Sequence, residues 1–410
     1  MAEATQTVTR RETKGTFLLG SLTLGHTAIH WYQALYSVVL PSIKAGLGLT
    51  DVQLGILSSV RQLTSGPLML PSGVLADLFR RHTAIILALS FAFMGVAYFL
   101  VGLAPSYLWI LPAIALVGVG TALWHPAAMS SLSLKFPQRR GSALAIHGVG
   151  ASIGDTITPI VIGALLITIA WRDLLKLQLI PGVILALLLW RLLASTYGDQ
   201  SVVRPSFGSY MKDMKDLVRH PVVLAIIGVN GLTGMARLSV MTFLPIYIQE
   251  ELGYSTVVLG IYLALLYAMG AVSQPLMGYL SDRFGRKVVL VPSLFIFGLL
   301  LAALAIAQPG IQLVLVIGAL GLFFYSLANV TQATVMDVAS TNVQASTMGV
   351  TSVFGQSISL PGPVIAGLLI TAYGNGAAFL FAGAVTLVAA ILLAAVHVPR
   401  SSRPTPRVLG

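Results

Sequence analysis

Residues 73–81 read G-V-L-A-D-L-F-R-R, and residues 278–286 read G-Y-L-S-D-R-F-G-R. Both stretches contain the pattern Gly-x-Leu-x-Asp-x-x-x-Arg, and they lie 205 residues apart (from 73 to 278) in a chain of 410 residues. Each copy follows one apolar segment of helix length and precedes another. One short loop of this kind arises easily by chance, whereas two copies at half the chain length indicate a duplicated membrane protein.

The composition supports this interpretation. Apolar residues make up 56% of the chain and charged residues only 9%, and the mean hydropathy is +0.89. A soluble protein of this length needs more charge to cover its surface. Most of the apolar runs reach the ~20 residues that a helix needs to cross a bilayer. The composition therefore predicts a polytopic membrane protein and excludes a soluble globular one.

The net charge of +11 follows membrane topology rather than a nucleic-acid surface, so no nucleic-acid partner is predicted. Eighteen of the 24 Lys and Arg residues fall in alternate connections between the apolar segments. The connections between these hold only Lys44, Arg172 and Lys176. This asymmetry predicts that both termini and the long central loop are cytoplasmic. The eighteen are Arg10, Arg11, Lys14, Arg80, Arg81, Lys135, Arg139, Arg140, Arg204, Lys212, Lys215, Arg219, Arg283, Arg286, Lys287, Arg400, Arg403 and Arg407.

Several chemistries are excluded because their residues are missing from the sequence. There is no cysteine, so disulfides and thiolate metal sites are excluded. There is no G-x-x-x-x-G-K-[ST] loop, so this chain does not use ATP as its energy source, and no cofactor is predicted. The first 14 residues are polar and lead straight into a long apolar segment, which predicts an uncleaved first span.

Twelve spans fit the hydropathy pattern, and 197–219 is the only long polar connector among them. We therefore predict an all-α membrane protein with twelve transmembrane helices in two pseudo-symmetric six-helix bundles. The predicted domains are an N-terminal bundle over 1–196, a cytoplasmic linker over 197–219 and a C-terminal bundle over 220–410. The spans are 15–44, 52–78, 83–104, 107–134, 141–170, 173–196, 220–249, 255–281, 288–308, 310–337, 345–372 and 375–398.

A second recurrence lies in the fifth span of each half. The pattern Pro159-x-x-x-Gly163 returns as Pro363-x-x-x-Gly367. Glycine lets two helix backbones approach closely, and proline bends a helix. Tight packing explains these residues, and so do the hinge-like gating helices of a two-fold membrane carrier.

These features resemble the major facilitator superfamily over the whole chain. Within it, the N-terminal half is similar to the fosmidomycin-resistance branch of bacterial efflux carriers. The resemblance implies a secondary transporter that works by alternating access as a monomer. It also implies proton antiport, with drug-resistance-like efflux of a small solute across the cell inner membrane. The residues that carry the similarity are His26, Gln53-x-Gly55, Val117-Gly118-x-Gly120, His125-Pro126 and Pro159.

The sequence departs from that branch where the branch carries acids. The branch has an acid four residues after the first-span histidine, and here that residue is His30. The His-Pro-Glu of its fourth span reads His-Pro-Ala at 125–127, and the Gly-Pro of its fifth span reads Thr158-Pro159. The missing acids favour an alternative, proton-coupled uptake of an organic anion. An intramembrane enzyme is a remote alternative that leaves the duplicated loop unexplained, so the protein is not predicted to be an enzyme.

Five ionisable side chains fall near the middle of predicted spans, counted at ~1.5 Å of rise per residue. Such groups cost roughly 2.5–3.5 kcal/mol each on insertion scales and usually face a cavity. Arg61 and Arg237 stay charged and can hold carboxylate or phosphonate oxygens with two parallel donors. Because Asp155 could pair with only one of them, an anionic substrate is expected; the alternative is that the arginines bond helix carbonyls. The predicted substrate-binding residues are Arg61, Arg237, His30, Tyr36, Gln33 and Asn329.

The predicted proton-coupling residues are Asp155, His26 and His30, because imidazole titrates near pH ~6.5 and a buried carboxylate can change its protonation state. His26 and His30 are four residues apart and share one helix face. No acid and no third histidine stands at ligand spacing along the sequence, so no metal site is predicted. The alternative is that the two imidazoles simply bond to neighbouring helices. His125 and His147 lie nearer the cytoplasmic ends of their spans and are interpreted as structural.

The repeated loop is predicted to gate the carrier. In the family that the chain resembles, the loop aspartate caps the start of span eleven, and the arginine pairs with an acid on span four. Here the C-terminal copy has such an acid in Asp337 at the end of span ten, whereas span four offers none, so the latch is predicted to be asymmetric. The predicted gating residues are Gly73, Asp77, Arg81, Gly278, Asp282, Arg286 and Asp337.

Overall fold

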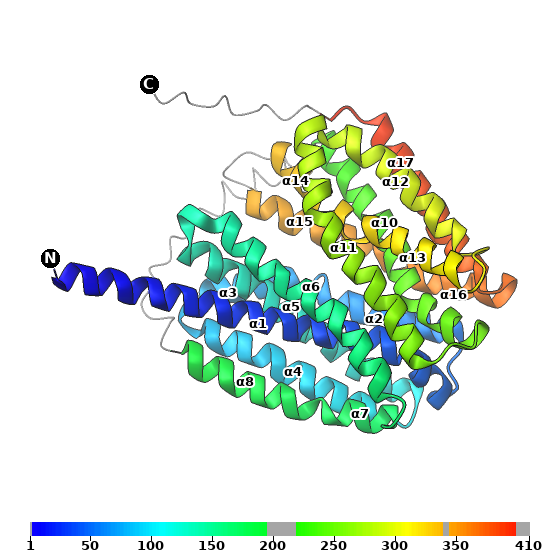
Figure 1. Ribbon diagram of the computed structural model, residues 1–410, viewed down its shortest axis with the longest axis horizontal. Helices are drawn as coiled ribbons and strands as arrows, with labels where there is room; N and C mark the ends of the chain where they lie inside the picture. Colours follow the sequence, from blue (N-terminus) through cyan, green and yellow to red (C-terminus); the bar gives the residue numbers. More distant parts are fainter. Residues whose placement is uncertain (1, 195–218, 339–343, 399–410) are drawn as a thin grey trace.

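The computed structural model describes residues 2–194, 219–338 and 344–398, and these residues form helices and connections without any strand. Ten helical segments among them are long and apolar enough to cross a membrane. The first two predicted spans are not among the ten, because polar side chains dilute the first and a break divides the second into two short helices. The described residues nevertheless make twelve passes. They form two helical bundles, which confirms the predicted fold class (Figure 1).

Each bundle is built from one half of the chain. The first comprises α1 (Ala2–Leu47), α2 (Asp51–Ser65), α3 (Met69–Leu78), η1 (Arg80–His82), α4 (Thr83–Leu103), α5 (Tyr107–Lys135), η2 (Pro137–Arg139), α6 (Arg140–Leu165), α7 (Trp171–Leu177) and α8 (Leu179–Leu193). The second comprises α10 (Pro221–Ile246), the π-helical turn η3 (Tyr247–Glu251), α11 (Thr256–Phe284), α12 (Arg286–Ala303), α13 (Ile311–Phe324), α14 (Ser326–Val338), α15 (Gln344–Ser359), α16 (Gly362–Tyr373) and α17 (Gly376–Ala395). The predicted linker over 197–219 lies outside the described residues except for Arg219.

Four of the twelve passes are each divided into two helices: α7 and α8 separate at Gln178, and the other three breaks lie near mid-depth. The second pass breaks between α2 and α3 at Gly66-Pro67, and the eleventh breaks between α15 and α16 at Leu360-Pro361. Proline lacks the backbone N–H that would continue the helical hydrogen bonds, which explains both of these breaks. The tenth pass breaks at Tyr325, between α13 and α14.

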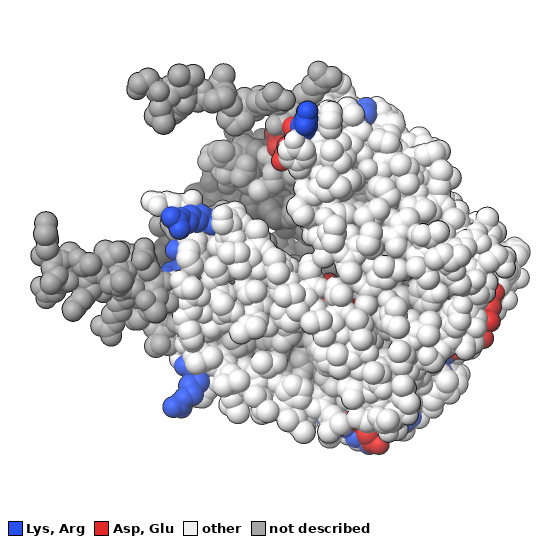
Figure 2. Space-filling view, in the orientation of Figure 1, with Lys and Arg blue, Asp and Glu red and all other residues white. Residues whose placement is uncertain are grey.

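The connections define two faces of the molecule. We call the face with the connections at 79–82, 136–139 and 285 the motif face, since it carries both copies of the repeated loop. The opposite face carries the connections at 48–50, 104–106, 166–170, 252–255, 304–310 and 374–375. On the side of the molecule seen in Figure 2, the described surface between the two faces is almost free of charge, and the charged side chains gather at its edges.

The duplication is most exact in its geometry on the opposite face. Gly48 and Gly253, 205 positions apart, have backbone φ angles of 60° and 67°, a region that glycine adopts without a steric penalty. Two residues later, Thr50 and Ser255 cap α2 and α11. Each side-chain oxygen accepts a hydrogen bond from the backbone N–H three residues on, at 3.2 and 3.4 Å respectively. The two halves therefore enter their second passes by the same turn.

The bundles meet through two tight helix crossings, and the first of these joins α2 to α16. A side chain added at Gly55 would overlap the backbone carbonyl of Pro363. One added at Gly367 would place its Cβ 2.6 Å from the carbonyl oxygen of Asp51. Nearby, the Ser59 hydroxyl donates a hydrogen bond of 2.6 Å to the carbonyl oxygen of Leu360. Glycine is required here because the backbones themselves are in contact.

The second crossing, between α6 and α11, repeats the first by pseudo-symmetry. A Cβ at Gly260 would overlap the carbonyl of Pro159, and one at Gly163 would overlap the carbonyl of Thr256. The Thr256 hydroxyl donates a 2.7 Å hydrogen bond to the Gly163 carbonyl. The recurring Pro-x-x-x-Gly pattern is thus a packing device at both crossings.

We expect Gly55→Ala and Gly260→Ala to lower the temperature of thermal unfolding of the purified protein. Each added methyl group would force two helix backbones apart, and such overpacking costs about 1–3 kcal/mol. Gly20→Ala is the matched control, because no atom lies within 4 Å of a Cβ built at this exposed helical position. The control should unfold at the same temperature or higher, since alanine favours helix over glycine. Equal unfolding temperatures in all three variants would contradict the role of the crossings.

Candidate functional site

A cavity of about 450 Å³ lies between the bundles, and both halves line it. Four of the five ionisable groups predicted at mid-depth are among the lining residues, namely His30, Arg61, Asp155 and Arg237. The fifth, His26, lies behind this wall and is buried. The amides that line the cavity are Gln33, Gln62, Asn230, Gln332 and Gln356, and the aromatic residues are Tyr267, Phe297, Phe323, Phe324 and Tyr325.

Arg61 reaches the cavity from α2 and is backed by an aromatic ring. Its guanidinium carbon lies 4.6 Å from the ring centroid of Tyr36, a cation–π distance. The Tyr36 hydroxyl forms a 2.9 Å hydrogen bond with the Ser58 hydroxyl, and the Thr242 hydroxyl donates to the same oxygen at 2.9 Å. Tyr36 was predicted to bind substrate, but it is buried and does not line the cavity. The Tyr36 ring instead packs against the guanidinium group of Arg61.

Arg237 approaches from the other half, on α10. Its guanidinium carbon lies 4.7 Å from the ring centroid of Tyr325 and 5.3 Å from that of Phe324. The Tyr325 ring stacks in turn on Tyr267, with 5.6 Å between ring centroids. Aromatic faces hold this cation without neutralising it.

The only deep carboxylate among the described cavity residues does not pair with either arginine. Asp155 Oδ2 lies 3.0 Å from His30 Nδ1, an ion-pair contact that lacks the straight geometry of a hydrogen bond. None of the ion pairs between described residues includes Arg61 or Arg237. The pairing of Asp155 with one of the two arginines, which the sequence left open, is therefore not the arrangement in this structure. His30 lies closer because α1 and α6 pack through Gly154, where an added Cβ would lie 2.9 Å from the His30 Cβ.

Two predicted uncharged ligands differ in position. Gln33 lines the cavity, and its buried Nε2 has no hydrogen-bond partner among the described residues. Asn329 lies outside the cavity, where its Nδ2 donates a 2.8 Å hydrogen bond to Gln274. The reason is the helix phase after the break at Tyr325, because Ala328 and Gln332 face the cavity and Asn329 is turned about 100° further round the helix.

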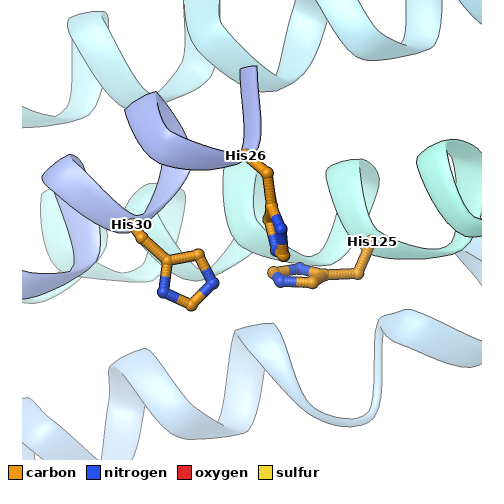
Figure 3. Close-up of side chains that lie close together, drawn as sticks. All are labelled: His26, His30 and His125. Atoms are coloured by element: carbon orange, nitrogen blue, oxygen red, sulfur yellow. The ribbon is translucent and has the colours of Figure 1, made fainter. Parts of the chain in front are cut away.

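Histidines from three helices gather behind His30. The ring centroid of His26 lies 4.7 Å from that of His30 and 5.4 Å from that of His125 on α5, and it stacks on His147 of α6 at 3.9 Å. Figure 3 shows the first three rings grouped together. Along the sequence no third histidine stood at ligand spacing, but in space His125 supplies one. Gly25 allows this approach, since an added Cβ would overlap the buried Trp124 ring.

The repeated loop forms a charge cluster in its C-terminal copy. Arg286 pairs with Asp282 in the loop, and its Nε lies 2.9 Å from Asp337 Oδ2 at the end of α14. This is the acid that the sequence analysis selected. In the N-terminal copy, Gly73 lies against Pro126 and Arg81 is exposed, while the side chain of Asp77 lies outside the described residues. The gating role of both copies, including Gly278, stays a prediction.

An ion cluster on the opposite face was missed by the sequence analysis. Lys44 Nζ at the end of α1 lies 2.8 Å from Asp51 Oδ1 and 2.6 Å from Glu250 Oε2. Because Glu250 belongs to the other bundle, this contact joins the halves. Lys44 had been noted only as one of three cations in its set of connections, and its partner is 206 residues away along the chain. The sequence signal for this contact is a basic residue at the end of the first span and an acid at the end of the seventh, which is the equivalent span of the other half.

We expect Lys44→Gln to raise the population of molecules that are open on the opposite face. A partly exposed ion pair contributes about 0.2–1 kcal/mol, so the equilibrium should shift by a few-fold. The chain has no cysteine, so spin labels can be attached at Thr168→Cys and Gln308→Cys, in connections of different bundles. Pulsed electron resonance should then show an additional population of molecules with a longer distance between the two labels. Lys176→Gln is the matched control, since Lys176 pairs with Asp173 inside one bundle. An unchanged distance distribution in Lys44→Gln would leave this cluster without a gating role.

Comparison with known proteins agrees with the fold. The sequence matches the profile of the Major Facilitator Superfamily over residues 22–361 and 228–410. It is 26% identical over 285 residues to the fosmidomycin resistance protein of Escherichia coli, covering 67% of each chain. It is 23% identical over 396 residues to a probable L-galactonate transporter of the same species, covering 90% of this chain and 86% of that protein. The crystal structure of a D-xylose–proton symporter superposes with a TM-score of 0.75 at 18% identity, over 94% of this chain and 98% of that one.

Proposed function

Because the chain belongs to the Major Facilitator Superfamily, and is therefore a membrane transporter rather than an enzyme, we propose that it carries a small organic anion. The observation that carries this proposal is the charge of the cavity wall. Arg61 and Arg237 contribute two fixed positive charges, one from each bundle, and Asp155 is the only carboxylate among the lining residues. A carboxylate or phosphonate group on the solute would supply the missing negative charge.

Unused hydrogen-bond donors in the cavity support an anion further. The Nε of Arg237 and the Nε2 of Gln33 are both buried without a hydrogen-bond partner among the described residues. Leaving a buried donor unpaired costs about 1–3 kcal/mol, and more for a charged group. An anionic oxygen between the bundles would satisfy donors from both halves at once. Such a ligand would bind preferentially when the two bundles are close together.

The remaining cavity wall indicates an amphipathic solute of modest size. Phe297, Phe323 and Phe324 contribute apolar surface beside the arginines. A cavity of about 450 Å³ falls within the usual range for small-molecule sites, roughly 300–1,000 Å³. The solute we propose therefore has one acidic group and an apolar or hydroxylated body.

We propose that the protein exports its solute in exchange for protons. We also propose that its physiological role is antibiotic resistance. The similarity to a fosmidomycin resistance protein supports this direction. The second candidate is proton-coupled uptake of an organic anion, which the similarity to a probable L-galactonate transporter favours. Both candidates use a proton gradient, as the name of the structurally similar D-xylose–proton symporter says of that protein. The roles of Asp155, His26 and His30 in proton coupling stay predictions.

The motif face is proposed to lie on the cytoplasmic side of the inner membrane, which places both termini there, and the protein is proposed to act as a monomer. The asymmetry of Lys and Arg supports this orientation. A membrane-impermeant thiol reagent added to intact cells tests it. The reagent should label Ser106→Cys on the opposite face and spare Gln138→Cys on the motif face. The reverse labelling would invert the orientation.

If the solute is an anion held by Arg237, we expect Arg237→Gln to lower its affinity strongly. Removing one partner of a buried charged contact costs about 3–5 kcal/mol, so the affinity for an anionic solute should fall a hundredfold or more. Arg237→Lys should restore only part of it, because an ammonium group lacks the planar two-donor geometry. Binding is measured by thermal stabilisation of the purified protein with a panel of sugar acids, monocarboxylates and phosphonates, starting from galactonate against its uncharged counterpart galactose.

Arg191→Gln is the matched control for this experiment. Arg191 is an exposed arginine on α8 and does not line the cavity, so its loss should leave anion affinity unchanged. If an anion binds and its affinity is the same in Arg61→Gln, Arg237→Gln and the wild type, the arginines are structural. The proposal of an anionic substrate would then be wrong.

Proteoliposomes distinguish the two directions of coupling. For an antiporter, acidifying the lumen should accelerate uptake of a labelled anion into the vesicles, because protons leave as the solute enters. For a symporter, acidifying the outside should accelerate the same uptake. An electrically shunted membrane, with potassium and valinomycin on both sides, is the control against a voltage effect. Equal uptake under both gradients would exclude proton coupling.

A further inference from the structure

Three imidazole rings converge inside the N-terminal bundle, behind the wall of the central cavity. His26 and His30 come from successive turns of α1, and His125 comes from α5 (Figure 3). One ring nitrogen from each lies within 4.8 Å of the other two. The ring centroids of His30 and His125 are 5.9 Å apart, and both rings lie edge-on to His26. This is a compact group of nitrogen donors from two helices.

In each ring the Nδ1 atom faces an oxygen that can only accept a hydrogen bond. His26 Nδ1 lies 2.8 Å from the carbonyl oxygen of His147, and His125 Nδ1 lies 3.1 Å from the carbonyl oxygen of Thr121. His30 Nδ1 faces the carboxylate of Asp155 at 3.0 Å. A carbonyl or an ionised carboxylate cannot donate, so the hydrogen of each neutral ring is placed on Nδ1. The lone pair is then left on Nε2 in all three rings.

One of these lone pairs is buried without a partner. His26 is 7% exposed, and its Nε2 has no hydrogen-bond partner among the described residues. A buried acceptor left unpaired costs about 1–3 kcal/mol. His147 does not satisfy it, because its ring stacks flat on His26, with planes 2° apart, and presents a face rather than an N–H. The buried Nε2 of His26, inside the group of three rings, therefore lacks an electron-pair acceptor.

We propose that His26, His30 and His125 bind a divalent transition-metal ion of the zinc, nickel or cobalt class through their Nε2 atoms. Imidazole nitrogen suits these ions, whereas calcium and magnesium prefer oxygen ligands. With metal–nitrogen bonds of about 2.0–2.1 Å, the three nitrogens must come within about 3.4 Å of one another. Rotations of the side chains about their own bonds can supply that contraction. Three protein ligands leave a fourth position open for water or a solute group.

Asp155 is the positioning residue of this site. Histidines that bind metals usually donate their other N–H to a carboxylate or carbonyl, which fixes the ring and increases its basicity. The carbonyls of His147 and Thr121 stand in this relation to His26 and His125. The Asp155 carboxylate lies 3.0 Å from His30 Nδ1, so a small rotation of the His30 ring would let it accept that hydrogen. Of the three ligands only His30 lines the central cavity, so the ion enters past His30.

Binding is tested on the full chain, purified in detergent with a streptavidin-binding tag, because a polyhistidine tag would itself bind the ion. Calorimetric titration with Zn²⁺ should show one ion per chain. Titration with Co²⁺ should give the visible absorption of a nitrogen-ligated ion, a signature that needs no variant. The absence of cysteine removes thiolate as a competing ligand. Neither measurement uses a gradient or a transported solute, so a failure here is separate from a failure of the proposed transport function.

Variants assign the ion to this cluster. His30→Gln and His125→Gln should each weaken Zn²⁺ binding at least tenfold, and His30→Gln is the safer of the two because its side chain borders the cavity. Asp155→Asn should retain one ion per chain but bind it roughly 10–100-fold more weakly. His397→Gln is the matched control, since His397 is exposed near the end of α17, and it should bind Zn²⁺ as the wild type does. Thermal unfolding of each variant establishes that it is folded.

Two results would overturn the proposal. The wild-type protein could bind no Zn²⁺ or Co²⁺ in stoichiometric amount, which would leave the cluster as packed neutral imidazoles or as a proton site. Alternatively, binding could persist unchanged in folded His30→Gln and His125→Gln, or disappear in His397→Gln, which would place the ion elsewhere on the chain.

Discussion

The contact of helix backbones at two symmetric crossings is the constraint on which the rest of this structure depends. Gly55 and Gly260 admit the carbonyl groups of Pro363 and Pro159, and the same pattern holds for the partner glycines Gly367 and Gly163. These contacts hold the bundles together on the opposite face and fix the distance across which the cavity residues face each other. The Lys44 cluster strengthens the same junction with charge, but only modestly, because its members are partly exposed to water.

The cavity that results holds two arginines in an unusual electrostatic situation. Aromatic rings pack against both guanidinium groups, while the Asp155 carboxylate pairs with His30 rather than with an arginine. Two like charges facing one low-dielectric space repel, and that repulsion is relieved only when something negative enters. Solute binding and closeness of the bundles are thereby coupled through one electrostatic term. The histidine cluster lies one layer behind, and its member His30 contacts the same carboxylate.

Much of the fold was predictable from the sequence, because hydropathy, the duplicated loop and the placement of Lys and Arg are each read along the chain. The depth of Arg61, Arg237 and Asp155 was predictable for the same reason, by counting residues from the ends of a span. The direction in which a side chain points around its helix could not be predicted in this way. Asn329 turns away from the cavity because of a helix break at Tyr325 that carries neither proline nor glycine. The grouping of His125 with the α1 histidines, and of Lys44 with Glu250, required knowledge of which helices are neighbours.

The breaks at Gly66-Pro67, Tyr325 and Leu360-Pro361 divide their passes into a segment toward the opposite face and a segment toward the motif face. Work done on α3, α14 or α15 is therefore absorbed by a few backbone torsions and need not reach the crossings. In mechanical terms the protein has two compliances in series. The segments toward the motif face are soft, and the two helix crossings are stiff. Displacing the segments toward the motif face then has little elastic cost, whereas separating the bundles on the opposite face requires whole helix backbones to part.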